Sequence, residues 1–308
     1  MKIRYLVTSL IIIFSIQSLA QRDFSTSKVT KVILLGTGTP NPSPQNAGSS
    51  LVILVNDKPY LIDFGAGVVR RAAAVSTNWG GKYDGMNVEN IKNAFLTHLH
   101  SDHTTGYPDL ILTPWVMGRN EPLEVYGPEG ITAMTNHILE AYREDIAYRI
   151  YGDEPINNQG WKVNSYEILK EGIIFKDENV SVEAFPVIHG TWPNAWGFRF
   201  TTPDKTIVIS GDTAPCPKIE EYSKNADILI HEVYSKAGFD KKNDFWKNYH
   251  HKNHTSTYEL AELAVKTKPK IIILTHLLFW GSSELDLLNE MAEKYDGKVY
   301  VARDLDVF

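Results

Sequence analysis

Three histidines and one aspartate lie within six residues in the segment Thr97-His98-Leu99-His100-Ser101-Asp102-His103. The segment follows residues 91–96, which predict a strand that ends where the polar residues begin. Side chains two residues apart share one face of a strand, so we expect His98 and His100 to point the same way. Imidazole and carboxylate groups bind zinc, and a site without thiolates is usually catalytic. The segment predicts a two-metal hydrolase, the alternative being histidines scattered over a surface loop.

Three further candidate ligands each close a predicted strand beside a turn. They are His189 after residues 185–188, Asp212 after residues 207–209, and His276 after residues 271–275. Strand ends hold side chains rigidly, which a metal site requires. Taken singly, each residue could be a core histidine or a capping aspartate. Together with the first cluster, they favour one metal centre.

The elements that must position these residues alternate between short apolar strands and helices. Strands are predicted at residues 29–35, 49–55, 59–62, 123–126, 180–186, 196–201, 206–209, 228–232, 271–274 and 298–302, and helices at 68–74, 107–115, 129–148, 257–266 and 284–295. No internal repeat or low-complexity linker divides the chain. The pattern predicts an α/β fold, an αββα sandwich with the site along one edge of its sheets.

The first twenty residues have a different composition from the rest of the chain. Lys2 and Arg4 precede the mostly apolar residues 6–16, and Ser18-Leu19-Ala20 supplies small residues for a cleavage point. This pattern predicts a secretory signal peptide, since the apolar run is short for a membrane span. We therefore expect an exported protein, periplasmic or secreted, with one domain over residues 21–308 and no stable membrane insertion after cleavage. An uncleaved N-terminal anchor is the alternative.

The net charge bears on the possible partners, and the cysteine content bears on disulfide bonds. The chain has 31 Lys and Arg against 37 Asp and Glu, a net charge of −6, and cleavage would also remove Lys2 and Arg4. An acidic surface repels polyanions, so we expect no nucleic-acid partner. The single cysteine, Cys216, excludes an internal disulfide and is interpreted as a small buried residue.

Over nearly all of residues 21–308 the chain resembles the metallo-β-lactamase superfamily, and within it the branch of ribonuclease Z and the related metal-dependent arylsulfatases. The resemblance is carried by the histidine cluster and by the segments Leu35-Gly36-Thr37-Gly38-Thr39-Pro40, Asp63-Phe64-Gly65-Ala66-Gly67, Leu123-Glu124-Val125-Tyr126-Gly127-Pro128-Glu129-Gly130, Ser210-Gly211-Asp212-Thr213, His231-Glu232, His254-Thr255-Ser256-Thr257 and Leu274-Thr275-His276. The histidine cluster points to the superfamily. The placement of His254, 22 residues before His276, points to the branch.

The resemblance implies two divalent metal ions, with zinc expected. One ion would be held by His98, His100 and His189, and the other by Asp102, His103 and His276, with Asp212 bridging both. A hydroxide shared by the two ions would be the nucleophile, because paired metals lower the pKa of a bound water. We take Asp102, Asp212 and His254 as the catalytic residues.

The resemblance also implies roles for Asp63 and His254, and Glu232 is considered beside them. Asp63 is expected to orient a ligand histidine, the alternative being a plain turn aspartate. His254 is expected to donate a proton to the leaving group or to bind an oxyanion, the alternative being a helix cap. Glu232 would support His254 or simply close a strand.

The substrate expectation comes from a departure from ribonuclease Z. That family carries a protruding arm for tRNA between the residues matching His189 and Asp212, which here are only 23 positions apart. We therefore do not expect tRNA 3′ processing. Aromatic residues near the ligands, above all Trp192 and Trp280, instead suggest a pocket for a small-molecule ester, an aryl or alkyl sulfate or a phosphodiester. The alternatives are a lactone or β-lactam hydrolase and a metal-binding scaffold protein without turnover; a homodimer is an open possibility.

Overall fold

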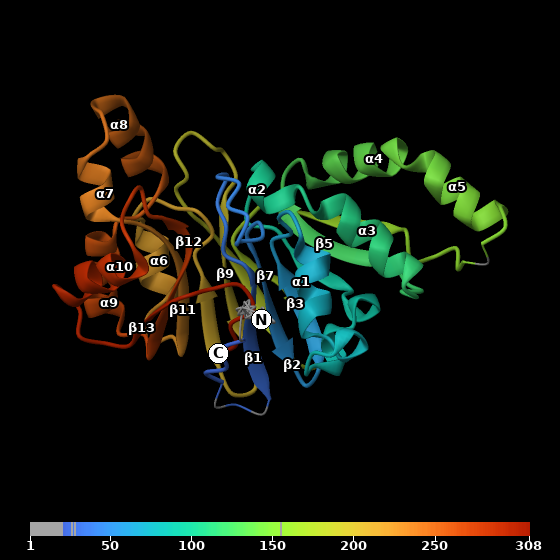
Figure 1. Ribbon diagram of the computed structural model, residues 1–308, viewed down its shortest axis with the longest axis horizontal. Helices are drawn as coiled ribbons and strands as arrows, with labels where there is room; N and C mark the ends of the chain where they lie inside the picture. The colour runs from blue at the N-terminus through green and yellow to red at the C-terminus, as the bar shows by residue number, and fades with distance from the viewer. Residues whose placement is uncertain (1–20, 26, 28, 155) are drawn as a thin grey trace, which may run out of the picture.

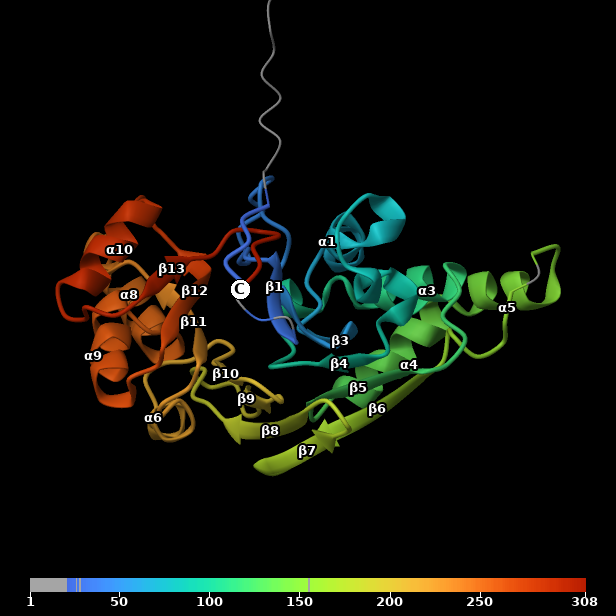
Figure 2. The ribbon, with the colours of Figure 1, turned by 90° about the horizontal axis from the view of Figure 1, so that it is seen from below.

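The computed structural model describes residues 21–308 except residues 26, 28 and 155, so the predicted signal peptide lies outside the described residues. Two β-sheets pack face to face, and helices cover the outer face of each (Figures 1 and 2). This arrangement confirms the predicted α/β class and the αββα sandwich. No helix among the described residues is both long and apolar enough to span a bilayer.

The first sheet has the strand order β1-β2-β3-β4-β5-β6. Its strands β1 to β3 pair antiparallel, and β3 to β6 pair parallel. The strands are β1 (Thr30–Gly36), β2 (Ser50–Val55), β3 (Lys58–Ile62), β4 (Asn93–Phe95), β5 (Leu123–Pro128) and β6 (Val163–Ile168). The carboxyl ends of the parallel strands meet at one edge, where β4 leads into the histidine cluster.

The second sheet has the order β13-β12-β11-β10-β9-β8-β7. Strands β10 to β13 pair parallel, and β7 to β10 pair antiparallel. The strands are β7 (Gly172–Lys176), β8 (Ser181–Pro186), β9 (Trp196–Thr201), β10 (Thr206–Ile209), β11 (Ile228–Tyr234), β12 (Ile271–Leu278) and β13 (Val299–Val301). Only β9, β10 and their connections lie between His189 and Asp212, so no arm leaves the sheet there.

Helices α1, α3 and α4 lie on the first sheet, and α6, α9 and α10 lie beside the second (Figure 2). The α-helices are α1 (Val68–Val75), α2 (Ser101–Thr104), α3 (Tyr107–Val116), α4 (Ile131–Ala141), α5 (Arg143–Tyr151), α6 (Pro217–Tyr222), α7 (Lys236–Asp240), α8 (Asp244–Asn253), α9 (Thr257–Thr267) and α10 (Glu284–Ala292), and the 3₁₀ helices are η1 (Thr77–Trp79), η2 (Asp84–Met86) and η3 (Val88–Asn90). Sequence-encoded caps fix several starts; Ser256 and Glu259 form a capping box on α9.

The core explains why the strands are apolar on both faces. In β1, Val32 and Leu34 face the second sheet, whereas Ile33 and Leu35 face the helices of their own half. Between the sheets, Phe95 packs edge-on against Phe200 at 5.3 Å between ring centroids. Burial on both faces is what stabilises two stacked sheets with helices outside them.

One predicted helix differs from the structure, and two strands were not predicted. The helix expected over residues 129–148 is two helices, α4 and α5, because the backbone of Tyr142 departs from helical geometry at φ −102° and ψ 13°. No glycine or proline marks that break in the sequence. Strands β6 and β7 were not predicted, since their side chains are only partly buried and lack an apolar alternation.

Candidate metal centre

The predicted strand ends before the polar residues, as expected: His98 and His100 lie in the loop that follows β4, and Asp102 and His103 lie in the short helix α2. Strand β4 ends at Phe95, and the chain continues through Thr97 into the short helix α2. Thr97 fixes this loop, because its amide donates to Oδ1 of Asp63 at 2.8 Å and its carbonyl accepts from the amide of Trp196 at 2.9 Å. The second of these hydrogen bonds crosses between the two halves of the sandwich. The loop is therefore held from both sides.

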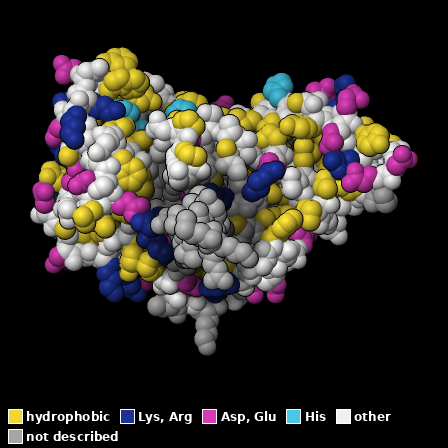
Figure 3. Space-filling model, viewed as in Figure 1, with side chains coloured by type: hydrophobic (Ala, Val, Ile, Leu, Met, Phe, Trp, Pro, Cys, Tyr) yellow, Lys and Arg dark blue, Asp and Glu magenta, His cyan; other side chains and the backbone are white. Residues whose placement is uncertain are grey.

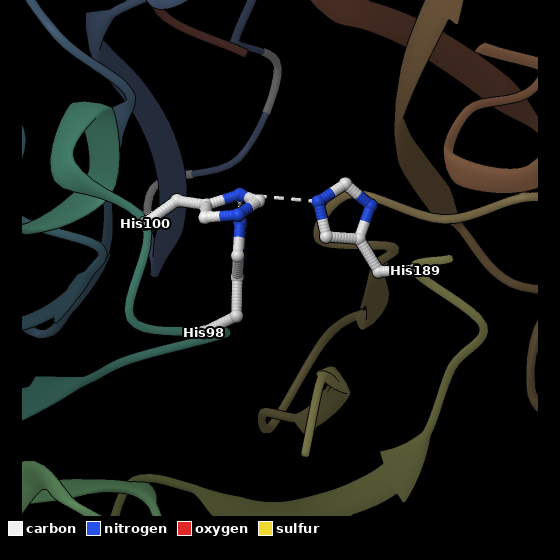
Figure 4. A group of neighbouring side chains, drawn as sticks. All are labelled: His98, His100 and His189. Carbon is white, nitrogen blue, oxygen red and sulfur yellow. Dashed lines mark hydrogen bonds between the residues drawn. The ribbon is translucent and has the colours of Figure 1, made fainter. Parts of the chain in front are cut away.

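Three imidazoles converge in the first group of candidate ligands (Figure 4). Nδ1 of His100 lies 3.0 Å from Nε2 of His98 and 3.1 Å from Nε2 of His189. The other ring nitrogen of His189 donates to the carbonyl of Asn253 at 2.8 Å. This hydrogen bond fixes the tautomer and leaves the Nε2 lone pair aimed at the group, as a metal ligand requires.

The second group consists of Asp102, His103, Asp212 and His276. Its donor atoms all lie within 4.8 Å of one another. Nε2 of His276 is 3.0 Å from Oδ2 of Asp102 and 3.4 Å from Oδ2 of Asp212. Asp212 also lies 3.9 Å from Nε2 of His98, a member of the first group. Its carboxylate is therefore placed between the two groups.

Backbone irregularities aim the ligands of the second half. His276 has φ 46° and sits where the register of β11 and β12 shifts, so the bulge turns its side chain toward the site. Asp212 follows Gly211, whose φ is 60°, and a Cβ there would lie 2.8 Å from the carbonyl oxygen of Trp196. Only glycine fits that position, which brings Asp212 close against the loop of Thr97.

The protonation states suit metal binding. Burial lowers the pKa of His98 well below its usual value, so its imidazole is neutral. Burial would raise the pKa of Asp212, but His276 and His103 beside it hold that pKa well below its usual value. Nε2 of His103 is buried and has no hydrogen-bond partner among the described residues. Burial would lower the pKa of His103 and of His276, but the carboxylates beside them, above all Asp212, raise both, so a bound cation would displace a proton from each ring. Imidazole nitrogens and an ionised carboxylate form a donor set that fits divalent cations.

Asp63 holds His103 from the side away from the group. Nδ1 of His103 donates to Oδ2 of Asp63 at 2.7 Å, and Thr97 Oγ1 donates to the same carboxylate at 3.0 Å. Asp63 has φ 55°, a left-handed conformation that Asp tolerates better than most residues. The strain is stored at the position that orients His103.

Glu232 and His254 form a buried pair beside the second group. Oε1 of Glu232 accepts from Nδ1 of His254 at 3.3 Å and from the amides of Thr213 and Thr255 at 3.2 and 3.0 Å. Burial and then the neighbouring charge of Asp212 raise the pKa of Glu232 well above its usual value. Burial lowers the pKa of His254 to about 4. His254 is therefore neutral before substrate binds, and it lines the cavity described next.

A cavity of about 470 Å³ opens in front of both groups. It is lined by Pro40, Asn41, His100, Ser101, Asp102, His189, Asp212, Lys242, Trp246, Tyr249, His250, His254, His276, Leu278 and Trp280. Trp280, predicted to form the pocket, is among these residues. Trp192 is not; its ring instead packs against the ring of His100, at 4.4 Å between centroids.

Sequence reasoning missed the part of the cavity wall that α8 supplies. Trp246, Tyr249 and His250 recur at helical spacing, but the surrounding residues are polar and gave no apolar stripe to predict α8. Trp246 and His250 lie four residues apart, and His250 lies four residues before His254. This helical spacing is the signal in the sequence that could have predicted that they share one face of α8.

Comparisons with known proteins agree with this geometry. Residues 60–277 match the family described as the Beta-lactamase superfamily domain. The chain belongs to the metallo-β-lactamase superfamily. It belongs to the ribonuclease Z branch, since it is 32% identical over 250 residues to a ribonuclease Z of Mycobacterium sp. (strain KMS), covering 80% of this chain and 84% of that protein. It is also 29% identical to the ribonuclease Z of Mycobacterium marinum, over 89% and 96% of the two chains.

Solved structures share the superfamily fold. The metallo-beta-lactamase fold protein YhfI from Bacillus subtilis superposes with a TM-score of 0.67 at 18% identity, over 91% of this chain and 99% of that one. The short form of human tRNase Z superposes with a TM-score of 0.65 at 23% identity, over 90% of this chain and 98% of that one.

Membership of the metallo-β-lactamase superfamily makes the protein a metal-dependent hydrolase that uses divalent ions. The seven predicted ligands form the two groups above, and their individual roles stay predictions.

The ribonuclease Z relatives overturn part of the sequence interpretation. The expected small-ester substrate, the arylsulfatase-like character and the exclusion of a nucleic-acid partner are wrong, as is the dismissal of tRNA 3′ processing. The prediction from net charge was wrong because net charge averages the whole surface, whereas a substrate is attracted or repelled by the local charge at the cavity. The absence of an arm between His189 and Asp212 does not exclude an RNA substrate, because other elements can contact it.

Proposed function

We propose that the protein is a metal-dependent phosphodiesterase that cleaves RNA, with a tRNA 3′ extension as its substrate class. The observation that carries this proposal is the convergence of two donor groups on Asp212, in a chain whose curated relatives are named ribonuclease Z. A nucleic-acid phosphodiester offers anionic oxygens that such a centre can neutralise.

Each donor group would hold one ion. His98, His100 and His189 would hold the first, and Asp102, His103 and His276 the second, with Asp212 between them. When bound, two such ions, for which we propose zinc on the nitrogen and carboxylate donors, activate water and neutralise phosphate charge. Asp63 contributes by holding the ring of His103 in place.

His254 supplies the proton for the leaving oxygen in this proposal. Its Nδ1 is anchored on Glu232, which leaves the other ring nitrogen for the cavity. A bound phosphodiester carries negative charge, which favours the protonated imidazole that the free protein disfavours. Oε1 of Glu232, 3.3 Å from Nδ1 of His254, accepts a hydrogen bond from the ring and so keeps its other nitrogen directed at the cavity.

The test is cleavage of an RNA hairpin with a single-stranded 3′ extension by the zinc-loaded protein. We expect one cut at the base of the extension, its loss on chelation and its return on adding zinc. Asp212→Asn should abolish cleavage, and Trp79→Ala, at an exposed position far from the centre, should leave it intact. Two ions per chain without any RNA cleavage would refute the proposal.

We also propose that the protein is exported, so that the RNA it cleaves would be RNA found outside the cytoplasm. The support is the basic start, apolar run and small residues of positions 1–20. Cell fractionation with an antibody to the protein, and the N-terminal sequence of the mature form, test this. A mature chain beginning at Met1 in the cytoplasm would contradict it.

A further inference from the structure

We propose that one wall of the cavity is a nucleotide subsite, in which a base stacks on aromatic rings and Lys242 meets a phosphate. The wall consists of Trp246, His250 and Trp280, called here the aromatic wall. The subsite would bind the nucleotide that adjoins the cleaved bond, so this inference rests on the proposed function and deepens it.

The rings of the aromatic wall form a continuous surface. His250 is nearly parallel to Trp246, with 24° between planes and 5.6 Å between centroids, and lies 4.2 Å from Trp280. Trp246 stays 45% exposed although it is a large apolar side chain. Over α8, hydrophobic, basic and histidine side chains lie side by side on the surface (Figure 3). Exposed aromatic surface next to a reactive centre is costly to leave uncovered and suits a flat ligand.

Lys242 provides the charge that a nucleotide needs. Its Nζ lies 4.5 Å from the ring centroid of Trp280, and no carboxylate lies within 4 Å of it among the described residues. An exposed cation–π contact is weaker than the stacking of a base on an indole. A base can therefore displace the ammonium from the ring, and the freed ammonium then pairs with a phosphate.

The aromatic wall is anchored before any ligand arrives. Trp280 has φ 45°, a conformation that a tryptophan adopts only when its surroundings enforce it. Helix α7 presses on that turn through Gly238, where a Cβ would lie 2.6 Å from the carbonyl oxygen of Phe279. The buried carboxylate of Glu290 accepts from the amides of Lys236 and Ala237 at 2.9 Å each and pins the start of α7. A preset wall spares a ligand the ordering cost.

The arrangement of charge favours a nucleotide over other occupants. On one side the cavity presents the two donor groups, which would take the reacting phosphate. On the other side it presents the aromatic wall and an unpaired lysine. In single-stranded RNA each ribose lies between two phosphates and carries its base to the side, so one nucleotide can offer a phosphate to the donor groups, a base to the aromatic wall and its other phosphate to Lys242. The aromatic wall therefore matches a nucleotide in both its flat surface and its charge.

The first experiment uses 2-aminopurine riboside 5′-monophosphate, a fluorescent nucleotide without a cleavable diester. Titrated with the zinc-loaded protein, it should show saturable quenching, because stacking quenches its base. We expect Trp280→Ala and Trp246→Ala to raise the dissociation constant about 10-fold or more, and the Phe variants to restore most of the affinity. Lys242→Met should weaken binding and reduce its salt dependence. Trp79→Ala is the matched control. Ribose 5-phosphate binding as tightly as the nucleotide, or unchanged binding by the Ala variants, would overturn the subsite.

The second experiment separates this inference from the proposed function. Cleavage of the hairpin RNA is compared with cleavage of the same RNA carrying an abasic nucleotide next to the cut bond. We expect kcat/KM to fall about 10-fold or more for the abasic RNA in the unmodified protein, and the two RNAs to be cut equally by Trp280→Ala. Cleavage of both RNAs at equal rates by the unmodified protein would refute the subsite and leave the function standing. Saturable quenching of the nucleotide without any RNA cleavage would support the subsite and refute the proposed function.

Discussion

Nδ1 of His103 donates to the carboxylate of Asp63 at 2.7 Å, on the side of the imidazole away from the donor group. The same carboxylate accepts from the amide of Thr97 at 2.8 Å, so one side chain fixes both the loop and a predicted ligand. Asp63→Ala should therefore weaken metal binding about 10- to 100-fold without removing a predicted ligand. Competition with a zinc-binding dye measures this, and Asp84→Ala, in the 3₁₀ helix η2, is the control. Unchanged affinity would show that His103 needs no such support.

Removing the imidazole of His254 should slow the reaction while leaving the metals in place. His254→Ala is expected to lower kcat by about 10²- to 10⁴-fold, the usual range for a lost proton donor. Glu232→Gln should give a smaller loss and shift the pH–rate profile, since Glu232 acts through His254. Elemental analysis of both variants is the check, because loss of zinc would assign these residues to metal binding instead.

Arg119 should be a stability residue. Its guanidinium is buried and donates to the carbonyls of Gly160, Ile91, Leu110 and Ile111. Burial lowers its pKa to about 10, so it stays charged at neutral pH. Arg119→Met leaves those carbonyls without a donor and should cost about 3 kcal/mol in the free energy of unfolding. Urea denaturation measures this against Arg70→Met, an exposed control. A difference under about 1 kcal/mol would contradict it.

Acid should weaken a link between the two sheets at Asp177. Burial would raise the pKa of Asp177, but hydrogen bonds from Lys58 and Tyr60, at 2.8 and 2.7 Å, lower it overall. Because its pKa is lower in the folded than in the unfolded protein, its contribution is complete above the unfolded pKa of about 4 and is lost as pH falls through the folded value. Asp177→Asn should lose about 1 kcal/mol at pH 7 and little at pH 3. Equal losses at both pH values would rule out this charge effect.

Metal removal should lower thermal stability. An ion that binds only the folded state stabilises it by about 2.7 kcal/mol at a hundredfold excess over its dissociation constant. We expect chelation to lower Tm, zinc to restore it, and the zinc effect to shrink strongly in Asp212→Asn, since Asp212 lies between both groups. Differential scanning calorimetry gives the answer. A Tm independent of zinc would mean that the donor groups do not hold metal.

Much of the fold and the site could be predicted because both depend on local patterns. Apolar runs such as those of β1 and β11 predict buried strands, and polar residues at their ends predict where ligands gather. The seven predicted ligands accordingly fall in the two groups. The strand predicted over residues 91–96 ends at Phe95, where its pairing with β5 stops, so its end was predictable from the change to polar residues.

The rest depends on tertiary packing that a single sequence does not display. Trp246 and Trp280 lie 34 positions apart and meet only because α7 and α8 fold back over the turn after β12. Trp192 was predicted to face the pocket but packs on His100 instead, since proximity to a ligand in sequence does not set direction. The substrate class failed for a related reason: a net charge says nothing about which lysines are left unpaired at a cavity.

Four of the predicted ligands come from the loop after β4 and from α2 in the first half, and His189, Asp212 and His276 come from the second half. Neither half alone supplies all the ligands that either ion would need. An ion bound there would be coordinated by residues of both halves and would link them. Binding of the metal ions and docking of the halves would therefore be coupled. A chain whose two halves have not yet packed together would lack a complete ligand set, so activity that depends on these ions would appear only after the halves have docked.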